Sequence, residues 1–373
     1  MRLSSVGRLA KIVFGRYCPM SKMKVAVIGC GNIGKSAHIP SYMNNDTVEI
    51  KYFCDILPER AQAMVDQYHV GTAITDYHEA LADPEVEAVS VCVPNKYHSI
   101  IAIDALDAGK NVLCEKPAAR SYDEAVQMQQ AQKRSGKVLN IGVVNRFNTS
   151  VNLIKKMIDA GELGEVYHIY LSFRAPRSIP GMGGWFTTKE LSGGGALIDW
   201  GVHFLDLAMY CMGDPQPKTV SAETYCKLGK NMHEYAYTSM WSRDVPDFDG
   251  TYDVDDFVTG MIRTEGPTIT LNGAWAQNVN VNEMYIDFLG DKAGIRLQYG
   301  GKFSVYTSKD GVLYEIHPDY KMENMFQKEI DAFVNCIRSG EKLTAHIDTV
   351  LITAKIMQAM YDSSDAHREI QFQ

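Results

Sequence analysis

One glycine-rich segment near the start of the chain constrains the fold more than any other feature. Residues 25–34 read Val25-Ala-Val-Ile-Gly29-Cys-Gly31-Asn-Ile-Gly34, which is a short apolar strand, a turn with three glycines and the start of a helix. In this pattern the first glycine permits a tight turn, the second lets the backbone approach a pyrophosphate, and the third lets the helix pack against the strand. The N–H groups and the positive dipole end at the start of the helix attract phosphates. The segment therefore predicts a dinucleotide-binding site made by Gly29, Gly31, Asn32, Ile33 and Gly34.

A carboxylate follows at the spacing that such a site requires. Asp55 comes 21 residues after Gly34, at the end of the second apolar run. An acidic residue in this position bonds the adenosine ribose hydroxyls, whereas an arginine would accept the 2′-phosphate of NADP. Arg60 lies nearby, and we expect it to be a solvated helix residue. Asp55 therefore favours NAD as the cofactor.

The first part of the chain alternates between apolar runs and helical stretches. The expected strands are Val25–Ile28, Val48–Cys54, Ala88–Val93, Val112–Cys114 and Val138–Val143, and the expected helices include Glu59–Tyr68, Ser99–Ala108 and Tyr122–Ser135. This alternation is typical of βαβ units and of a parallel sheet whose strands are buried on both faces. Residues 23–145 are accordingly predicted to form a Rossmann domain of the α/β class with a doubly wound sheet.

After about residue 150 the pattern changes to period-2 strands framed by helices. The expected helices are Val151–Ala160, Ala196–Met212, Glu323–Ser339 and Thr349–Ser363, and the expected strands include Val166–Phe173, Phe257–Ile262, Ile269–Ala276, Tyr285–Leu289 and Phe303–Tyr306. Residues 146–373 should thus form a second α/β domain with a large, open, mostly antiparallel sheet. Residues 1–22, in which basic side chains face no acidic ones, are interpreted as a disordered N-terminal arm.

Charge and composition exclude several classes of function. The chain has 373 residues with 37 basic and 45 acidic side chains, a net charge of −8, which argues against a nucleic-acid binder. It contains no apolar run of 18 residues, so we expect no transmembrane helix. The 8 cysteines form no CxxC pair or metal-type cluster. We therefore expect reduced thiols, no bound metal and a cytoplasmic protein.

Three further motifs resemble one family. They are Val93-Pro94-Asn95-Lys-Tyr-His98, Cys114-Glu115-Lys116-Pro117, and Gly193-Gly-Gly-Ala-Leu-Ile-Asp199-Trp-Gly-Val-His203-Phe-Leu-Asp206. Together with the glycine turn they resemble the Gfo/Idh/MocA family of sugar and polyol oxidoreductases, over essentially all of residues 24–373. The resemblance implies a bound nicotinamide cofactor, a sugar or cyclitol substrate, and an open sheet that supports a homo-oligomer (a dimer, a tetramer or a larger assembly).

The same resemblance assigns site residues one by one. It makes Lys116, Asp199 and His203 the catalytic group, which also contacts the substrate. It places Pro94, Asn95, His98, Glu115 and Lys116 beside the cofactor, and Asn145 and Arg146 near the substrate. No core motif of the family is missing; the isomer of the Lys116–Pro117 peptide bond stays open.

The residues of the third motif also argue for a site on their own. In a regular helix Asp199, His203 and Asp206 would lie within one stripe, opposite apolar residues that should pack. A polar stripe on an apolar helix is costly unless it faces a site or is paired. We interpret Asp199 and His203 as functional and Asp206 as an orienting or capping residue. His203 would be the base, Lys116 would bond the substrate oxygen, and Asp199 would orient His203 or hold a neighbouring hydroxyl.

Substrate identity is less constrained. The Gly/Pro-rich loop 175–195 is longer than a simple connection needs to be, so we expect it to be functional. Its glycines give it freedom to close, and its Trp185 could stack on a sugar. The segment from Gly184 to Trp200 resembles family members that oxidise the C3 hydroxyl of glycosides such as puerarin, before a separate enzyme cleaves them. The alternatives are an inositol-type dehydrogenase, a redox glycosidase that recycles NAD, and a cofactor-binding regulator. The intact Lys116/Asp199/His203 set argues against the regulator.

Overall fold

The first sheet has the strand order of a doubly wound nucleotide-binding domain. This computed structural model describes residues 21–238 and 245–372, so the arm expected over residues 1–22 falls almost wholly outside the described residues. The six strands are β1 (Met23–Ile28), β2 (Val48–Cys54), β3 (Thr72–Ile74), β4 (Ala88–Val91), β5 (Asn111–Glu115) and β6 (Leu139–Gly142). They lie in the order β3-β2-β1-β4-β5-β6, and every neighbouring pair is parallel. The predicted Rossmann-type sheet is confirmed; only the three-residue β3 lacked an apolar run long enough to be expected.

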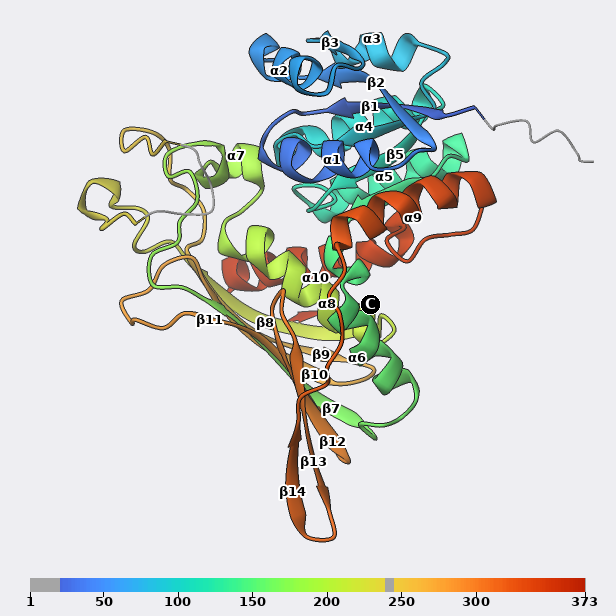
Figure 1. Ribbon diagram of the computed structural model, residues 1–373. Helices are drawn as coiled ribbons and strands as arrows, with labels where there is room; N and C mark the ends of the chain where they lie inside the picture. The colour runs from blue at the N-terminus through green and yellow to red at the C-terminus, as the bar shows by residue number, and fades with distance from the viewer. Residues whose placement is uncertain (1–20, 239–244, 373) are drawn as a thin grey trace, which may run out of the picture.

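Helices cover both faces of this sheet (Figure 1). They are η1 (Gly34–His38), α1 (Ile39–Met43), α2 (Pro58–Tyr68), α3 (Tyr77–Ala82), α4 (His98–Asp107) and α5 (Tyr122–Ser135), with one-turn helices η2 (Asn95–Tyr97) and η3 (Val144–Phe147) at two strand ends. α5 begins at Ser121, whose side chain accepts the Glu124 N–H, and ends at Gly136 in the left-handed conformation. Both are standard helix boundaries, which is why this helix was predictable from the sequence alone.

A nine-stranded sheet forms the second domain. Its strands are β7 (Val166–Arg174), β8 (Pro217–Tyr225), β9 (Phe257–Thr264), β10 (Thr268–Ala274), β11 (Glu283–Gly290), β12 (Ala293–Gln298), β13 (Phe303–Lys309), β14 (Val312–Ile316) and β15 (Ile370–Gln371). They lie in the order β14-β13-β12-β11-β7-β10-β9-β8-β15. β7 and β10 pair in parallel, whereas the other neighbours pair antiparallel. The expected mostly antiparallel sheet is confirmed.

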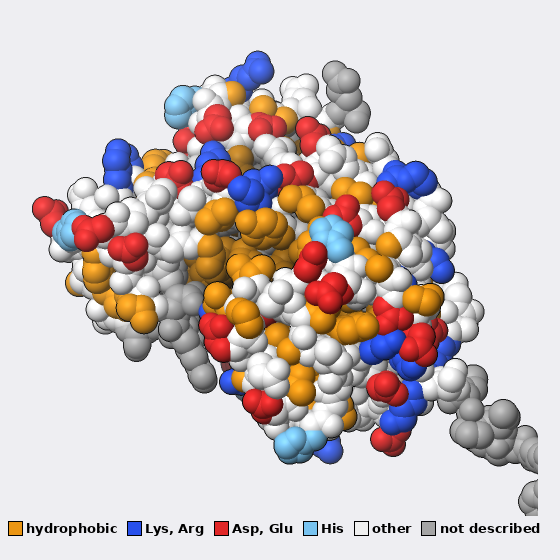
Figure 2. Space-filling model, turned by 90° about the horizontal axis from the view of Figure 1, so that it is seen from above, with side chains coloured by type: hydrophobic (Ala, Val, Ile, Leu, Met, Phe, Trp, Pro, Cys, Tyr) orange, Lys and Arg blue, Asp and Glu red, His pale blue; other side chains and the backbone are white. Residues whose placement is uncertain are grey.

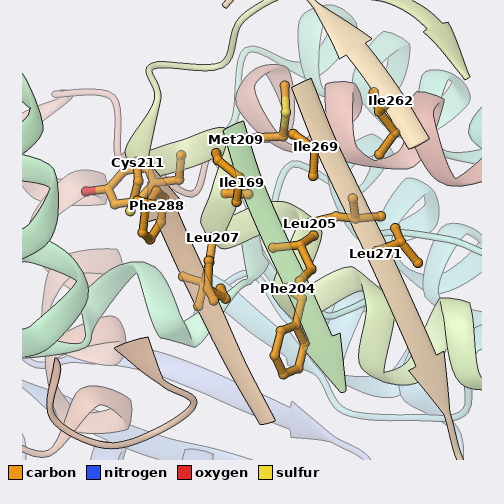
Figure 3. Packing of buried hydrophobic residues seen from close by; sticks show 14 of the residues in the cluster. Ile169, Phe204, Leu205, Leu207, Met209, Cys211, Ile262, Ile269, Leu271 and Phe288 are labelled. Atoms are coloured by element: carbon orange, nitrogen blue, oxygen red, sulfur yellow. The ribbon is translucent and has the colours of Figure 1, made fainter. Parts of the chain in front are cut away.

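Helices pack on one face of this sheet and leave the other face open. They are α6 (Thr149–Asp159), η5 (Leu197–Gly201), α8 (Val202–Cys211) and α10 (Ile347–Ala366). Figure 3 shows Phe204, Leu205 and Leu207 of α8 beside Ile169 of β7 and Leu271 of β10, all of them buried. Burial of these apolar side chains fixes the height and rotation of α8 above the sheet. The polar residues of the same helix are thereby held toward the first domain.

The C-terminal helices join the two domains. Phe333 and Val334 of α9 (Met325–Ser339) are part of the core on one face of the first sheet, and Ile347 and Val350 of α10 are part of the core on the other face. Figure 1 shows both helices, drawn in red, between the domains. The end of the chain therefore holds the nucleotide-binding domain and the second sheet together.

A lobe of loops stands beside the domain junction. It consists of residues 175–195, which include η4 (Trp185–Thr187) and α7 (Lys189–Ser192), and of the described parts of the excursion 226–256 with η6 (Met232–Glu234). Gly183 and Gly250 let the two loops touch, because a Cβ on Gly183 would lie 1.7 Å from the Asp247 carbonyl oxygen and one on Gly250 would lie 2.2 Å from that of Gly183. We expected the glycines of loop 175–195 to permit movement; at Gly183 the structure shows that the missing side chain permits close packing.

No helix within the described ranges is both long and apolar enough to cross a membrane. The seven cysteines that can be placed are all free thiols.

Candidate active site

The glycine turn after β1 has the shape of a phosphate cradle. Gly29 has φ of 101°, and a Cβ there would lie 2.2 Å from the Cys92 carbonyl oxygen; on Gly34 it would lie 2.1 Å from the Gly29 oxygen. These two glycines are therefore required by packing. Around Gly31 no atom lies within 4 Å of the Cβ position, so the backbone there borders open space. Asn32 and Ile33 begin the following helix, as expected for a dinucleotide site.

Asp55 is held against this cradle. Its Oδ2 accepts the Cys30 N–H at 2.9 Å and its Oδ1 accepts the Leu57 N–H at 3.0 Å. Each carboxylate oxygen keeps a further lone pair, so both could still accept ribose hydroxyls. Ile56 beside it is 86% exposed, and Arg60 lies exposed on α2 as expected. The residues fit a dinucleotide that carries free ribose hydroxyls.

Lys116 and Asp199 meet where the two domains join. β5 ends at Glu115, and the chain continues into Lys116 and a cis bond to Pro117. Lys116 Nζ lies 3.2 Å from Asp199 Oδ1 and donates to the Asp199 carbonyl oxygen at 3.4 Å. The second carboxylate oxygen of Asp199 is buried and has no hydrogen-bond partner. An acceptor of this kind is suited to a hydroxyl group of a bound molecule.

The helix that carries Asp199 and His203 begins with a widened turn. η5 is π-helical over Leu197–Gly201 and continues directly into α8. Asp255 anchors its start, because its two carboxylate oxygens accept the N–H groups of Gly195 and Leu197 at 2.7 and 2.9 Å. A π-helical turn changes the spacing of side chains along the helix, so the regular stripe that we expected is broken here.

His203 faces the same region from the next turn. Burial lowers its pKa well below the usual value, and the positive charge of Lys116 adds to the effect. The imidazole is therefore neutral at ordinary pH and has one nitrogen lone pair. Its Nδ1 lies 3.3 Å from Nδ2 of Asn145, and the same Asn145 nitrogen lies 3.0 Å from the Tyr299 hydroxyl. Tyr299 and Asp255 were not expected from the sequence, since no local motif marks either residue.

Arg146 and Asp206 pair with each other away from this group. The Arg146 Nε and Nη2 donate to the two oxygens of Asp206 at 2.8 and 2.7 Å, and neither side chain is more than 2% exposed. Arg146 also donates to the Thr344 carbonyl oxygen and the Thr349 hydroxyl. The guanidinium of Arg146 is thus used inside the protein, and the structure gives no support to the expectation that it contacts the substrate. Asp206 orients another side chain, as we interpreted it.

Three residues that were assigned to the cofactor make their side-chain bonds within the protein. Glu115 is buried and accepts from His38 Nε2 at 2.8 Å. Burial by itself raises the pKa of Glu115. The hydrogen bond and the charge of His38 outweigh this effect, so the pKa lies below its usual value. Both ring nitrogens of His98 lie against carbonyl oxygens, those of Val93 and Pro117. Asn95, which follows Pro94 in η2, donates to the Ser192 carbonyl oxygen at 2.8 Å. We assign these side chains to the support of the site.

The loop lobe contacts the nucleotide-binding domain through α7. Besides the bond from Asn95 to Ser192, Lys96 pairs with Glu190, and Arg120 donates to the Glu190 carbonyl oxygen. Trp185 precedes α7 and its ring lies 3.7 Å from that of Phe186, centroid to centroid. Figure 2 shows a hollow with a hydrophobic floor and a charged rim between this lobe and the main body. The lobe is thus positioned to border a ligand bound at the domain junction.

Comparison with known proteins agrees with this geometry. Residues 23–143 match the model of the GFO_IDH_MocA oxidoreductase family with its NAD-binding Rossmann fold, and residues 151–296 match a GFO/IDH/MocA C-terminal domain. The chain is 31% identical to the D-glucoside 3-dehydrogenase of Escherichia coli K12, over 94% of this chain and 98% of that protein. An inositol 2-dehydrogenase of Salmonella typhimurium is 35% identical over 38% of this chain and 43% of its own length. A solved levoglucosan dehydrogenase with NADH and levoglucosan has the same fold, with a TM-score of 0.80 at 22% identity, over 94% and 99% of the two chains.

Proposed function

The chain belongs to the GFO/IDH/MocA family of oxidoreductases with an NAD-binding Rossmann fold, and from this premise we propose that it oxidises the C3 hydroxyl of a glucoside. The product would be a 3-keto glycoside. The observation that carries the proposal is the similarity to a D-glucoside 3-dehydrogenase, which extends over nearly the whole length of both chains.

The open space at Gly31 and the position of Asp55 support NAD as the cofactor. Asp55 would hold the ribose hydroxyls, and a 2′-phosphate there would meet a carboxylate instead of a cation. When bound, the nicotinamide supplies the acceptor for a hydride from the sugar carbon. The protein then has to position the sugar, take up the hydroxyl proton and stabilise charge on the oxygen.

Lys116, Asp199 and His203 are suited to those tasks. The Lys116 ammonium, 21% exposed, would donate to the reacting oxygen and stabilise negative charge that develops on it. The neutral imidazole of His203 would accept the hydroxyl proton. The unpartnered oxygen of Asp199 would accept a hydrogen bond from a neighbouring sugar hydroxyl.

The pairing of the charged side chains in and around the candidate site favours a neutral substrate. Lys116 is paired with Asp199, and Arg146 is paired with Asp206, so neither cation is free to hold an acid group. A neutral polyhydroxyl compound can be bound by hydrogen bonds to the Lys116–Asp199 pair and by stacking. This reasoning supports a glycoside over a sugar acid.

A 3-keto group makes the neighbouring C–H more acidic, which prepares the glycoside for elimination by a separate enzyme. We therefore place the reaction as a step in glycoside breakdown. The similarity to an inositol 2-dehydrogenase favours a cyclitol as the second candidate substrate, although it covers only 38% of this chain.

Incubation with NAD and separate samples of glucose, inositols and aryl glucosides, followed by mass spectrometry, tests the proposal. Loss of two hydrogens from an intact glucoside with formation of NADH supports it. Oxidation of inositol alone would support the second candidate, and release of aglycone without net NADH would identify a redox glycosidase. Lys116→Met should lower turnover by about 10²–10⁴-fold and leave NAD binding in place, whereas Lys156→Met at an exposed position of α6 serves as the matched control.

The open face of the second sheet supports a homo-oligomer as well. Tyr167, Tyr170 and Tyr225 are 39–55% exposed on strands β7 and β8. Large apolar side chains on an exposed sheet face are typical of contact surfaces. Light scattering of the purified protein would measure the assembly.

A further inference from the structure

Asn145 and Tyr299, from distant parts of the chain, meet beside His203. Asn145 comes from η3, His203 from α8, and Tyr299 from the turn that follows β12. Asn145 is 4% exposed, and its amide nitrogen lies 3.3 Å from His203 Nδ1 and 3.0 Å from the Tyr299 hydroxyl. Tyr299 is held in turn by its ring, which stacks on Phe204 with centroids 4.7 Å apart. The contact leaves Nε2 as the ring nitrogen available to a substrate.

The group that faces Nδ1 decides what Nε2 can do. A neutral imidazole carries one proton, so one nitrogen donates and the other accepts. If the amide nitrogen of Asn145 donates to Nδ1, the proton of the ring is on Nε2, which can then only donate. If the amide oxygen faces Nδ1, the ring proton is on Nδ1, and Nε2 has the lone pair. A half-turn of the amide exchanges these two arrangements without moving the other atoms of the side chain.

We propose that Asn145 is a positioning residue that selects the tautomer of His203 by presenting its amide oxygen to Nδ1, and that Tyr299 holds the amide in this orientation. The proposal rests on the assignment of His203 as the base in the proposed function. The amide oxygen has two lone pairs, so it can accept both the Nδ1–H of His203 and the hydroxyl proton of Tyr299. One orientation thus satisfies both donors.

The chemistry needs this orientation in both directions. In oxidation, the electrons of the C–H bond leave as hydride to the nicotinamide, and those of the O–H bond form the second C–O bond. The released proton goes to Nε2, which must have a lone pair, so the ring proton must already be on Nδ1. In reduction, Nε2 gives a proton to the oxygen, and the doubly protonated ring again has Nδ1–H against Asn145. An amide oxygen is the acceptor that suits either direction.

The other titratable groups around His203 must keep their charge and position in any test of its titration. The Lys116 ammonium follows β5, the Asp199 carboxylate lies on η5, and the Tyr299 phenol lies after β12. Asp206, on the next turn of α8, is already paired with Arg146. Substitutions at Asn145 leave all of these in place, so a change in the titration of His203 can be traced to the amide.

The decisive measurement is nitrogen NMR of the histidine rings in the NAD complex without sugar, with His203→Gln to identify the signal. We expect the Nδ1–H tautomer in the wild type. Asn145→Asp keeps an acceptor and adds a negative charge, so it should keep that tautomer and move the acid limb of kcat/KM upward by about 1–3 pH units. Asn145→Leu should lower kcat by roughly 10–100-fold through loss of the oriented base, with an unchanged Kd for NAD. Tyr299→Phe should lower kcat less than Asn145→Leu does.

An Nε2–H tautomer in the wild type, or an acid limb that stays in place in Asn145→Asp, would overturn the proposal. So would full kcat in Asn145→Leu. Asn231→Asp, which adds the same charge at an exposed position, is the control and should leave the limb unmoved. The NMR measurement needs no sugar. If the protein shows the Nδ1–H tautomer but oxidises no glycoside, the proposed function fails and the proposal for Asn145 stands.

Discussion

Arg146 and Asp206 form a buried, two-point ion pair between η3 and α8, with N–O distances of 2.8 and 2.7 Å. Removing the arginine would leave a carboxylate buried without its counter-charge. Arg146→Met should therefore destabilise the fold by about 3–5 kcal/mol, measured by thermal or denaturant unfolding. The double variant Arg146→Met/Asp206→Leu should recover most of that loss.

Arg134→Ala is the matched control, because that arginine pairs with Asp107 at the surface and should contribute at most about 1 kcal/mol. If Arg146→Met has wild-type stability and a raised KM for the sugar, Arg146 contacts the substrate instead of stabilising the fold.

The lowered pKa of His203 determines how activity should depend on acidity. The imidazole acts as a base only when neutral, so kcat/KM should fall below the depressed pKa and stay level above it. The acid limb should thus lie below pH 6.5, the usual value for histidine. In Lys116→Met the residual activity should show this limb closer to 6.5, since one cause of the depression is gone, while burial remains. A wild-type limb at or above 6.5 would contradict this, and His78→Gln on the surface should change nothing.

Asp55 should select NAD over NADP. Replacement by alanine removes the repulsion of a 2′-phosphate and the acceptor for ribose hydroxyls at once. Asp55→Ala should narrow the ratio of kcat/KM for the two cofactors by about 10-fold or more, about 1.4 kcal/mol of discrimination. Asp66→Ala is the control, because Asp66 is exposed on α2, the helix that follows Asp55. Equal use of both cofactors by the wild type would show that Asp55 does not discriminate.

Trp185 should contribute to sugar binding. It lies in the lobe next to α7, whose contacts with Asn95 and Arg120 place the lobe against the nucleotide-binding domain. Loss of one apolar contact costs about 1–3 kcal/mol, so Trp185→Ala should raise KM for an aryl glucoside by roughly 10-fold or more. The Kd for NAD should change less, and Trp185→Phe should keep most of the affinity. Unchanged sugar kinetics would leave packing of the lobe as the role of Trp185.

Glu329 should make the fold sensitive to alkaline pH. Its side chain on α9 is buried, and both carboxyl oxygens have no hydrogen-bond partner. Burial, and next the negative charge of Glu115, raise its pKa well above 4.5 in the folded protein. The folded state therefore keeps a proton that the unfolded chain loses near pH 4.5, and stability is lost as pH rises from there toward the folded pKa.

Glu329→Gln stays neutral at every pH, so it should match the wild type below pH 4.5 and melt at a higher temperature at neutral and alkaline pH. Melting curves at several pH values measure the difference. Glu341→Gln at the surface should show no such trend, and a constant offset between the wild type and Glu329→Gln would refute the argument.

Much of the fold could be predicted because its signals are local. Gly29 and Gly34 mark the first turn, since each meets a steric demand, at the end of the neighbouring strand β4 for Gly29 and within the turn itself for Gly34. The ends of α5 are marked by Ser121 and Gly136 in the same way. β3 escaped notice because three residues carry too little hydrophobic pattern, and the π-helical turn at Leu197–Gly201 could not be foreseen because Asp255, far along the chain, holds its start.

The parallel first sheet and the mostly antiparallel second sheet could be predicted from the amino-acid sequence, which also offered Lys116, Asp199 and His203 as catalytic candidates. Periodicity and short motifs carry that information, because burial of apolar side chains acts on every residue of a strand or helix. Which polar groups meet became visible only in the folded chain. Arg146 pairs with Asp206, and Asn145 and Tyr299 lie together beside His203. Those choices depend on how two sheets and their helices pack, since a buried polar group must find its partner wherever the packing places one.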